Sequence, residues 1–268
     1  MKILIIYNRS KDIDGKNLNK LTSFLNDENM EYEINPNYEI VLNNEEDKLF
    51  KYDLIITLGG DGTVIHGCKY ALKYNIPVIG INAGHLGFLT QIDIKNIDKL
   101  KNLFSKNYIV NERTVVEATI NNDDKKYYAI NDVVVDRGEA IRLVDIDLYC
   151  NLEKVSSYRA DGLIVSTPVG STAYSLAAGG PIVDLSLKGM VLTPISSHSL
   201  KSRPIVFGAK KELKIISRSN HSLKVAVDGN VIKEIKKGEF VNVKISNKKY
   251  KFISLNKRSD LKIFDSPI

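Results

Sequence analysis

The sequence predicts an α/β N-terminal domain with a parallel, Rossmann-like sheet, followed by an all-β C-terminal domain. Strand and helix patterns alternate over the first hundred residues, which is typical of a parallel sheet with helical crossovers. Beyond Arg113 the segments become short, β-branched and often alternating, with polar turns between them, and this pattern indicates antiparallel structure. No low-complexity linker separates the two parts. We therefore expect the domains to pack closely, with the active site in the cleft between them.

Hydrophobic periodicity places the individual elements of the first domain. Strands are expected at residues 3–7, 54–58 and 76–81, where apolar and β-branched residues run together. Helices are expected near residues 17–28, from Thr63 onward, and at residues 97–104. In the second domain the predicted strands span residues 115–120, 127–135, 141–149, 162–166, 213–217, 223–227 and 240–245.

Composition excludes several classes of protein. The chain has 268 residues, of which 43% are hydrophobic, enough for a sizeable core. No apolar run approaches the roughly 20 residues of a membrane span, and the apolar start is too short for a secretory signal. Two isolated cysteines, Cys68 and Cys150, predict a reducing cytoplasm. The four histidines lack zinc-ligand spacing.

The positive charge of the chain is scattered. Net charge is +6, but pairs such as Lys125-Lys126 and Lys236-Lys237 stand among acidic residues. This arrangement favours a solvated surface over a nucleic-acid-binding face. A mildly positive protein still attracts anionic nucleotides.

A glycine-rich loop follows the strand predicted at residues 54–58. Gly59, Gly60 and Gly62 let the backbone approach a ligand closely. The helix that opens at Thr63 offers free N–H groups and a positive dipole end to a phosphate. Asp61, a carboxylate where an anion is expected, indicates catalysis. It either accepts a proton from a hydroxyl or holds a cation.

Three further motifs have both a ligand-binding and a local explanation. The block from Arg159 to Pro181 carries hydroxyls, a phenol and a short helix that Ser171 or Thr172 is expected to cap. It either binds sugar and phosphate oxygens or is only a well-capped turn. Asn131-Asp132 is either a turn or a ligand-binding pair. The segment from residue 227 to Asn230 is a hairpin turn by its Asp-Gly step.

Taken together, these motifs resemble those of the NAD kinase family. They include Gly59-Gly-Asp-Gly-Thr63, Gly80-Ile-Asn-Ala-Gly-His-Leu-Gly-Phe-Leu-Thr90, Asn131-Asp132, the block from residue 159 to 181, Ser202-Arg-Pro-Ile-Val206 and Val227-Asp-Gly229. The segment Thr167-Pro-Val-Gly-Ser-Thr-Ala-Tyr-Ser175 is the most specific of them. The resemblance implies transfer of the γ-phosphoryl group of ATP, or of another donor, to the adenosine 2′-hydroxyl of NAD. A divalent metal, Mg²⁺ being expected, would assist.

The resemblance also implies roles for individual residues. Asp61 would accept the 2′-hydroxyl proton, and a phosphate loop would comprise Gly59, Gly60, Gly62 and Thr63. The predicted NAD-binding set is Asp61, Gly62, His66, Asn131, Asp132, Arg159, Asp161, Thr172, Ala173, Tyr174, Ser175, Leu176, Ala177 and Asn230. His66 is alternatively a helix-surface histidine. At the position of Asp132 many members of the family have Glu. The shorter Asp side chain should still accept hydrogen bonds, with a slightly altered reach.

Domain boundaries follow from the change of pattern near Arg113, whereas the returning C-terminal segment and the assembly follow from the resemblance. We expect an α/β domain over residues 1–105, a β-rich NAD-binding domain over residues 106–247, and a C-terminal segment, 248–268, that packs back on the first. The resemblance implies a homodimer or homotetramer. The cysteines predict a cytoplasmic protein, and charge and hydropathy predict no nucleic-acid or membrane partner. The residues that hold the metal are not identified.

Two other functions compete with this interpretation. A lipid kinase of the diacylglycerol or sphingosine type shares the Gly-Gly-Asp-Gly loop, but it carries Gly-Thr-Gly-Asn-Asp after the next strand. This chain has Asn82-Ala-Gly-His-Leu-Gly-Phe88 there. A non-catalytic dinucleotide sensor would keep the block at residues 159–177 but would not need Asp61.

Overall fold

The computed structural model describes residues 1–35, 52–84, 87–199 and 202–255. It divides into two compact units, one formed by residues 1–113 with the chain from Tyr250, the other by Thr114–Lys249. The boundaries fall inside strands β6 (Ile109–Ile120) and β17 (Phe240–Ser254). The first unit has a parallel sheet and the second is antiparallel, so the predicted fold class is confirmed. The predicted cleft and the boundaries at residues 105 and 247 stay predictions.

The parallel sheet of the first unit is built from strongly apolar strands. Its order is β2-β1-β3-β4, with β5 and the end of β17 also paired to β4. The strands are β1 (Lys2–Tyr7), β2 (Glu31–Asn35), β3 (Leu54–Gly59), β4 (Val78–Asn82) and β5 (Ile92–Asp93). Every residue of β3 and β4 is buried, as expected for strands covered on both faces.

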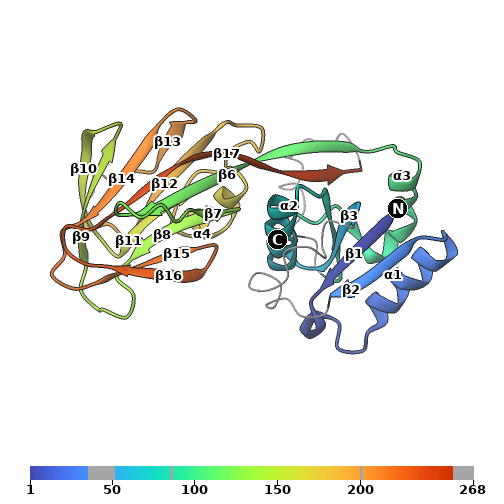
Figure 1. Ribbon diagram of the computed structural model, residues 1–268. Coiled ribbons are helices and arrows are strands. Elements are labelled where there is room, and N and C mark those ends of the chain that lie inside the picture. Colours follow the sequence, from blue (N-terminus) through green and yellow to red (C-terminus); the bar gives the residue numbers. More distant parts are fainter. Residues whose placement is uncertain (36–51, 85–86, 200–201, 256–268) are drawn as a thin grey trace. The chain divides into compact units, whose positions relative to one another are not determined.

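Helices cover both faces of this sheet (Figure 1). They are α1 (Lys16–Asp27), α2 (Asp61–Tyr74), η3 (Ile94–Leu100) and α3 (Lys101–Phe104). The short helix η1 (Arg9–Lys11) has no buried residue. Leu21 and Leu25 of α1 share a core with Ile56 of β3. Helix α2 packs on the other face so closely that a Cβ on Gly67 would lie 2.2 Å from Thr57.

One predicted helix takes a different form. The segment at residues 97–104 is a 3₁₀ helix up to Leu100 and an α-helix from Lys101. Asn96 has non-helical dihedral angles, φ −105° and ψ 36°. Ile97 and Leu100 are three residues apart in the sequence, and both are buried. A 3₁₀ turn places residues with this spacing on the same face of the helix.

The second unit contains two antiparallel sheets. One has the order β13-β12-β11-β8-β15-β16, where the strands are β8 (Asp132–Asp136), β11 (Gly162–Ser166), β12 (Gly189–Ile195), β13 (Ile205–Gly208), β15 (Leu223–Val227) and β16 (Asn230–Ile235). The other contains β10-β9-β14-β17, with β6 paired to β17 and β7. Its further strands are β7 (Tyr127–Ala129), β9 (Val144–Cys150), β10 (Glu153–Ala160) and β14 (Glu212–Ser217).

The core of the second unit lies between alternate residues of the two sheets. Val133 and Val135 of β8 share a cluster with Leu148 of β9. Val134, which points to the opposite face because side chains alternate along a strand, packs with Ile164 and against Ala178. That opposite face carries the segment containing η4 (Gly170–Thr172) and α4 (Tyr174–Ala177). No helix in the described part of the chain is long and apolar enough to cross a bilayer.

Candidate functional site

Asp61 is the first residue of α2, directly after the Gly60 N-cap. Its Oδ2 accepts a hydrogen bond from the amide of Phe88 at 2.9 Å, and its Oδ1 accepts one from the amide of Leu89 at 3.0 Å. Gly87 packs against the same carboxylate, because a Cβ there would lie 2.2 Å from Oδ1. A carboxylate has about four acceptor positions. The two amides therefore orient Asp61 and leave acceptor positions for a ligand hydroxyl.

The glycines of this loop have different surroundings. A Cβ on Gly59 would lie 2.4 Å from Oγ1 of Thr63, so the loop closes tightly there. Gly60 has no heavy atom within 4 Å of its Cβ position, and Gly62 is exposed. The carbonyl of Gly60 accepts the amides of Thr63 and Val64. The helix consequently begins at Asp61, two residues before the predicted start.

His66 lies on the first turns of α2 but is not a surface residue. It is 8% exposed, and its ring meets the ring of Tyr70 edge-on at 5.4 Å. The alternative interpretation as a helix-surface histidine is therefore wrong. His66 is buried together with the rest of its turn, since Val64, Ile65 and Cys68 of α2 are buried as well.

In the second unit the structure brings Asn131 against the Thr167 turn, although 36 residues separate them. The amide of Thr167 donates to the Asn131 carbonyl at 2.8 Å. Oγ1 of Thr167 donates to the Ile130 carbonyl at 2.6 Å and accepts the amide of Gly170 at 3.0 Å. A Cβ on Gly170 would lie 2.1 Å from the Asn131 oxygen. Two motifs that the sequence left separate thus form one structure.

Asp228 is a residue that sequence reasoning missed. It forms the predicted Asp-Gly hairpin turn with Gly229, with φ of 45° and 78°. Its carboxylate also accepts the amides of Ile130 at 3.1 Å and Asn131 at 2.7 Å, and a longer bond of 3.3 Å from Asp132. These bonds interrupt the predicted strand at residues 127–135, which divides into β7 and β8. Asn230 is exposed in the same turn, where its amide donates to the Asp228 carbonyl.

The hydroxyls at residues 171–175 do not cap α4, contrary to the prediction. Oγ of Ser171 donates to the Pro168 carbonyl at 2.7 Å, and Oγ1 of Thr172 donates to the Val169 carbonyl at 3.1 Å. Ala173 occupies the N-cap position without a side-chain bond. Both hydroxyls bond instead to the carbonyl three residues earlier in the chain, a local acceptor that Ser and Thr commonly use. Ser175 is buried and is bonded to Thr193 at 2.8 Å.

The remaining residues of this block differ in exposure. Tyr174 is 46% exposed, Leu176 and Ala177 are exposed, and Thr172 and Ala173 are half-buried. Burial raises the pKa of Tyr174, and nearby carboxylates of Asp136, Asp161 and Asp132 raise it further. The phenol therefore stays neutral at neutral pH and is able both to donate and to accept hydrogen bonds. Arg159 is exposed on β10.

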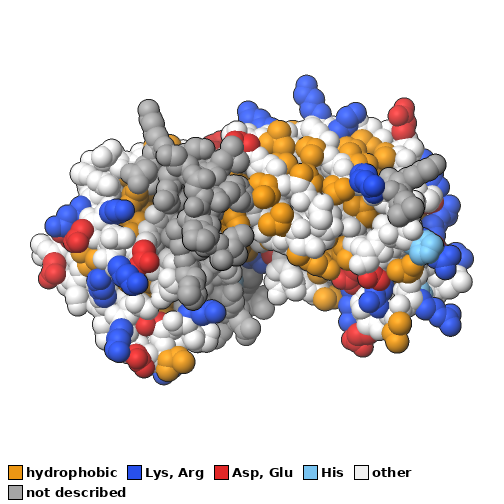
Figure 2. All heavy atoms as spheres, turned by 180° about the vertical axis from the view of Figure 1, so that it is seen from behind, with side chains coloured by type: hydrophobic (Ala, Val, Ile, Leu, Met, Phe, Trp, Pro, Cys, Tyr) orange, Lys and Arg blue, Asp and Glu red, His pale blue; other side chains and the backbone are white. Residues whose placement is uncertain are grey.

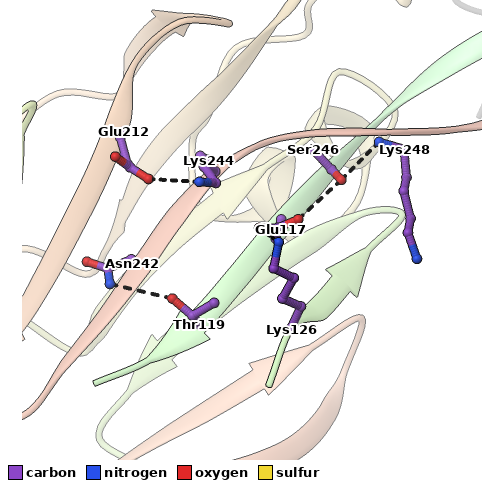
Figure 3. Close-up of polar contacts among 8 residues, drawn as sticks. All are labelled: Glu117, Thr119, Lys126, Glu212, Asn242, Lys244, Ser246 and Lys248. Carbon is purple, nitrogen blue, oxygen red and sulfur yellow. Dashed lines mark hydrogen bonds and ion pairs between the residues drawn. The ribbon is translucent and has the colours of Figure 1, made fainter. Parts of the chain in front are cut away.

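A cavity of about 350 Å³ in the second unit lies away from these residues. Its lining includes Glu117, Lys126, Lys244, Ser246 and Lys248 (Figure 3), none of which was predicted as a site residue. Lys126 pairs with Glu117 at 3.2 Å, and Lys244 pairs with Glu212 at 3.2 Å. Lys126 and Lys244 thus already have carboxylate partners, and Nζ of Lys248 lies 4.4 Å from the centre of the Tyr128 ring. This cavity carries no assignment.

A metal centre made by protein side chains is not present in the part of the chain that the structure describes. No three His, Cys, Asp or Glu residues there are placed to hold one ion. Mg²⁺ is commonly bound through one or two carboxylates and the phosphates of a substrate. An ion held in that way does not require a cluster of three protein ligands.

Family models match nearly the whole chain. The ATP-NAD kinase N-terminal domain matches residues 3–108, and the ATP-NAD kinase C-terminal domain matches residues 130–255. The chain is 40% identical to the NAD kinase of Caldicellulosiruptor saccharolyticus, with 97% of this chain and 96% of that protein covered. It is 44% identical to the NAD kinase of Legionella pneumophila over 72% of this chain and 68% of that protein.

Two solved structures of nucleotide-bound kinases have folds similar to that of this chain. An NAD kinase from Archaeoglobus fulgidus in complex with ATP has a TM-score of 0.75 at 25% identity, covering 98% of each chain. Yeast NADH kinase complexed with NADH has a TM-score of 0.80 and covers 99% of this chain and 86% of its own. At 23% identity it shows the fold alone. Two matching domain models and close relatives along the full length lead to one conclusion: the chain belongs to the NAD kinase family.

Proposed function

We propose that this protein transfers the γ-phosphoryl group of ATP to the 2′-hydroxyl of the adenosine ribose of NAD, producing NADP and ADP. Full-length relatives at 38–40% identity are NAD kinases, and a relative of the same fold has been solved in complex with ATP. The observation that carries the proposal is the placement of Asp61. Its carboxylate stands at the start of α2, oriented by two backbone amides, beside a glycine that borders open space.

In the proposed reaction the ribose oxygen forms a bond to the γ-phosphorus as the bond from that phosphorus to the β–γ bridging oxygen breaks. Phosphoryl transfer passes through a loose transition state, so positioning and charge neutralisation matter more than early deprotonation. Asp61 accepts a hydrogen bond from the 2′-hydroxyl and orients it in line with the donor. The hydroxyl proton passes to Asp61 late in the step. A divalent cation bound to ATP supplies neutralisation of phosphate charge.

We propose that NAD is bound by the residues that the resemblance implies, among them Asn131, Asp161 and Tyr174 of the second unit. Hydrogen bonds from Thr167 and Asp228 hold this part of the backbone in one arrangement, which supports a preformed site. We also propose a cytoplasmic enzyme, supported by a sequence with only two, widely spaced cysteines, and a homo-oligomer.

The decisive experiment incubates the purified protein with NAD, ATP and magnesium and measures NADP with an NADP-specific dehydrogenase. A parallel reaction with polyphosphate tests the alternative donor. Asp61→Asn should lower turnover about 10²- to 10⁴-fold, while the dissociation constant for NAD stays within about twofold. Asp27→Asn, an equal charge change at an exposed position, is the control.

Two outcomes would contradict the proposal. Near-normal turnover of Asp61→Asn would remove Asp61 from the reaction. Tight NAD binding without any NADP formation by the wild-type protein would favour the non-catalytic sensor.

A further inference from the structure

Arg137 and Asp161 are brought together by strand register. Strands β8 and β11 pair antiparallel, with Asp136 opposite Gly162. Arg137, the residue after β8, therefore lies beside Asp161, the residue before β11. The amide of Arg137 donates to the carbonyl of Asp161 at 3.0 Å. Neither the Asp-Arg-Gly segment nor its spacing from Asp161 predicts this pairing.

The side chains repeat the backbone contact. Nε of Arg137 lies 2.7 Å from Oδ1 of Asp161, and the side chains are 32% and 27% exposed. Another guanidinium nitrogen of Arg137 donates to the carbonyl of Ala140. A charge-assisted bond this short is among the stronger hydrogen bonds of proteins, and partial burial limits its screening by water. The guanidinium thus has defined partners on two sides, and the Asp161 carboxylate is oriented by it.

Arg137 also offsets part of the negative charge around Tyr174. Besides burial, the carboxylates of Asp136, Asp161 and Asp132 raise the pKa of the phenol, and the guanidinium of Arg137 lowers it. These groups therefore lie within electrostatic reach of one another. An anionic pyrophosphate that approaches Tyr174 meets less repulsion when Arg137 is present.

We infer that Arg137 is a positioning residue for NAD: it orients the Asp161 carboxylate and offsets the negative charge of that carboxylate beside Tyr174. This inference rests on the proposed function, because it takes Asp161 and Tyr174 to contact the dinucleotide. Arg137 acts on substrate binding through Asp161. It has no part in the transfer step at Asp61.

The first test separates binding from turnover. Arg137→Gln should raise KM for NAD about tenfold, the effect of losing one hydrogen bond to a charged group. Turnover at saturating NAD and KM for ATP should stay within about twofold. Arg137→Lys keeps the charge but loses the planar fork, so it should recover part of the loss. Arg142→Gln removes an equal charge from an exposed position in the same connection and should leave all constants unchanged.

The second test is a double-mutant cycle with Asp161→Asn. If Arg137 acts through Asp161, adding Arg137→Gln to Asp161→Asn should change KM for NAD by less than about twofold. If the two substitutions raise KM for NAD independently, so that their fold-changes multiply, the inference is overturned. An unchanged KM for NAD in Arg137→Gln would overturn it as well. Circular dichroism and thermal unfolding verify the fold, and Arg137→Lys decides the question if the Gln variant is unfolded.

Failure of this inference is distinguishable from failure of the proposed function. If the wild-type protein makes no NADP, the proposed function fails, whatever the variants do. If the wild-type makes NADP and Arg137→Gln matches it in KM, only the role of Arg137 is lost.

Discussion

Two aspartates each hold a distant stretch of backbone by accepting its amides. Asp61 accepts the amides of Phe88 and Leu89, and Asp228 accepts those of Ile130 and Asn131. Both stand next to glycines, one at the start of a helix and the other in a turn, where they are available to segments far along the chain. A buried or half-buried amide must find an acceptor. These carboxylates therefore shape the candidate site as much as the residues expected to touch the substrate.

Gly87 offers a direct test of how strictly Asp61 must be held. Gly87→Ala places a Cβ 2.2 Å from Oδ1 of Asp61, so the carboxylate or the loop must move. We expect turnover to fall about a hundredfold, because a displacement of about 1 Å is enough for such a loss. Initial rates at saturating NAD and ATP measure it.

Gly84→Ala is the matched control in the same loop. A Cβ at Gly84 meets no atom within 4 Å, and its backbone bonds to Asn82 remain possible. Its turnover should equal that of the wild type. A fully active Gly87→Ala variant would show that Asp61 tolerates displacement, and it would weaken its assigned role.

At the scale of elements, strand pairing decides which side chains meet. The sheet containing β8, β11 and β15 unites the Asn131 segment, Asp161 and the Asp228 turn. The other sheet of this unit has its own ionic network on β9, on β10 and at the residue that follows β14. There Asp147, 6% exposed, contacts Lys154 at 2.9 Å, Arg218 at 2.8 Å and Ser157 at 2.6 Å.

This network predicts a pH-dependent contribution to stability. Burial raises the pKa of Asp147, but hydrogen bonds from Ser157, Lys154 and Arg218 outweigh it and hold the pKa below its ordinary value. The contribution is therefore present above the unfolded pKa of about 4 and is lost as pH falls through the lower folded value. Asp147→Asn should reduce the free energy of unfolding by about 2 kcal/mol at neutral pH.

Urea unfolding of wild type and Asp147→Asn between pH 7 and pH 3 measures this contribution. The difference between them should hold from pH 7 to about pH 5 and shrink toward pH 3. Asp145→Asn, at an exposed position of the same strand, should show little effect at any pH. A difference that does not change with pH would mean that the ionised form of Asp147 is not the stabilising one.

At the scale of the whole molecule, charge is spread over the surface. Lys and Arg side chains lie among Asp and Glu on the face shown in Figure 2, in keeping with a modest net charge of +6. Such a distribution attracts anionic nucleotides in general. Recognition of NAD must then come from the local geometry of the candidate site.

The predicted homo-oligomer is tested on the intact protein. Light scattering coupled to gel filtration should give a mass about two or four times the 30.0 kDa of the chain. Several apolar side chains of the second unit are exposed, among them Ile182, Val206 and Val231, and burial of such groups stabilises association. A mass of one chain at micromolar concentration would contradict the prediction.

The sequence by itself determined the fold class, the two kinds of sheet and the family. Apolar periodicity and turn residues are local signals, and they place strands such as β11 and β15 at their observed bounds. The Gly-Gly-Asp-Gly loop and the block at residues 159–181 identify the family because their residue types are unusual together.

Only the tertiary structure decided how the site is supported. The amides that orient Asp61 belong to Phe88 and Leu89, and the partner of Asp161 is Arg137. Every residue except proline has an amide, so a backbone donor leaves no mark in the sequence. Strand register likewise depends on pairing between distant segments. Local patterns therefore name the reactive side chains, whereas long-range hydrogen bonds decide what holds them.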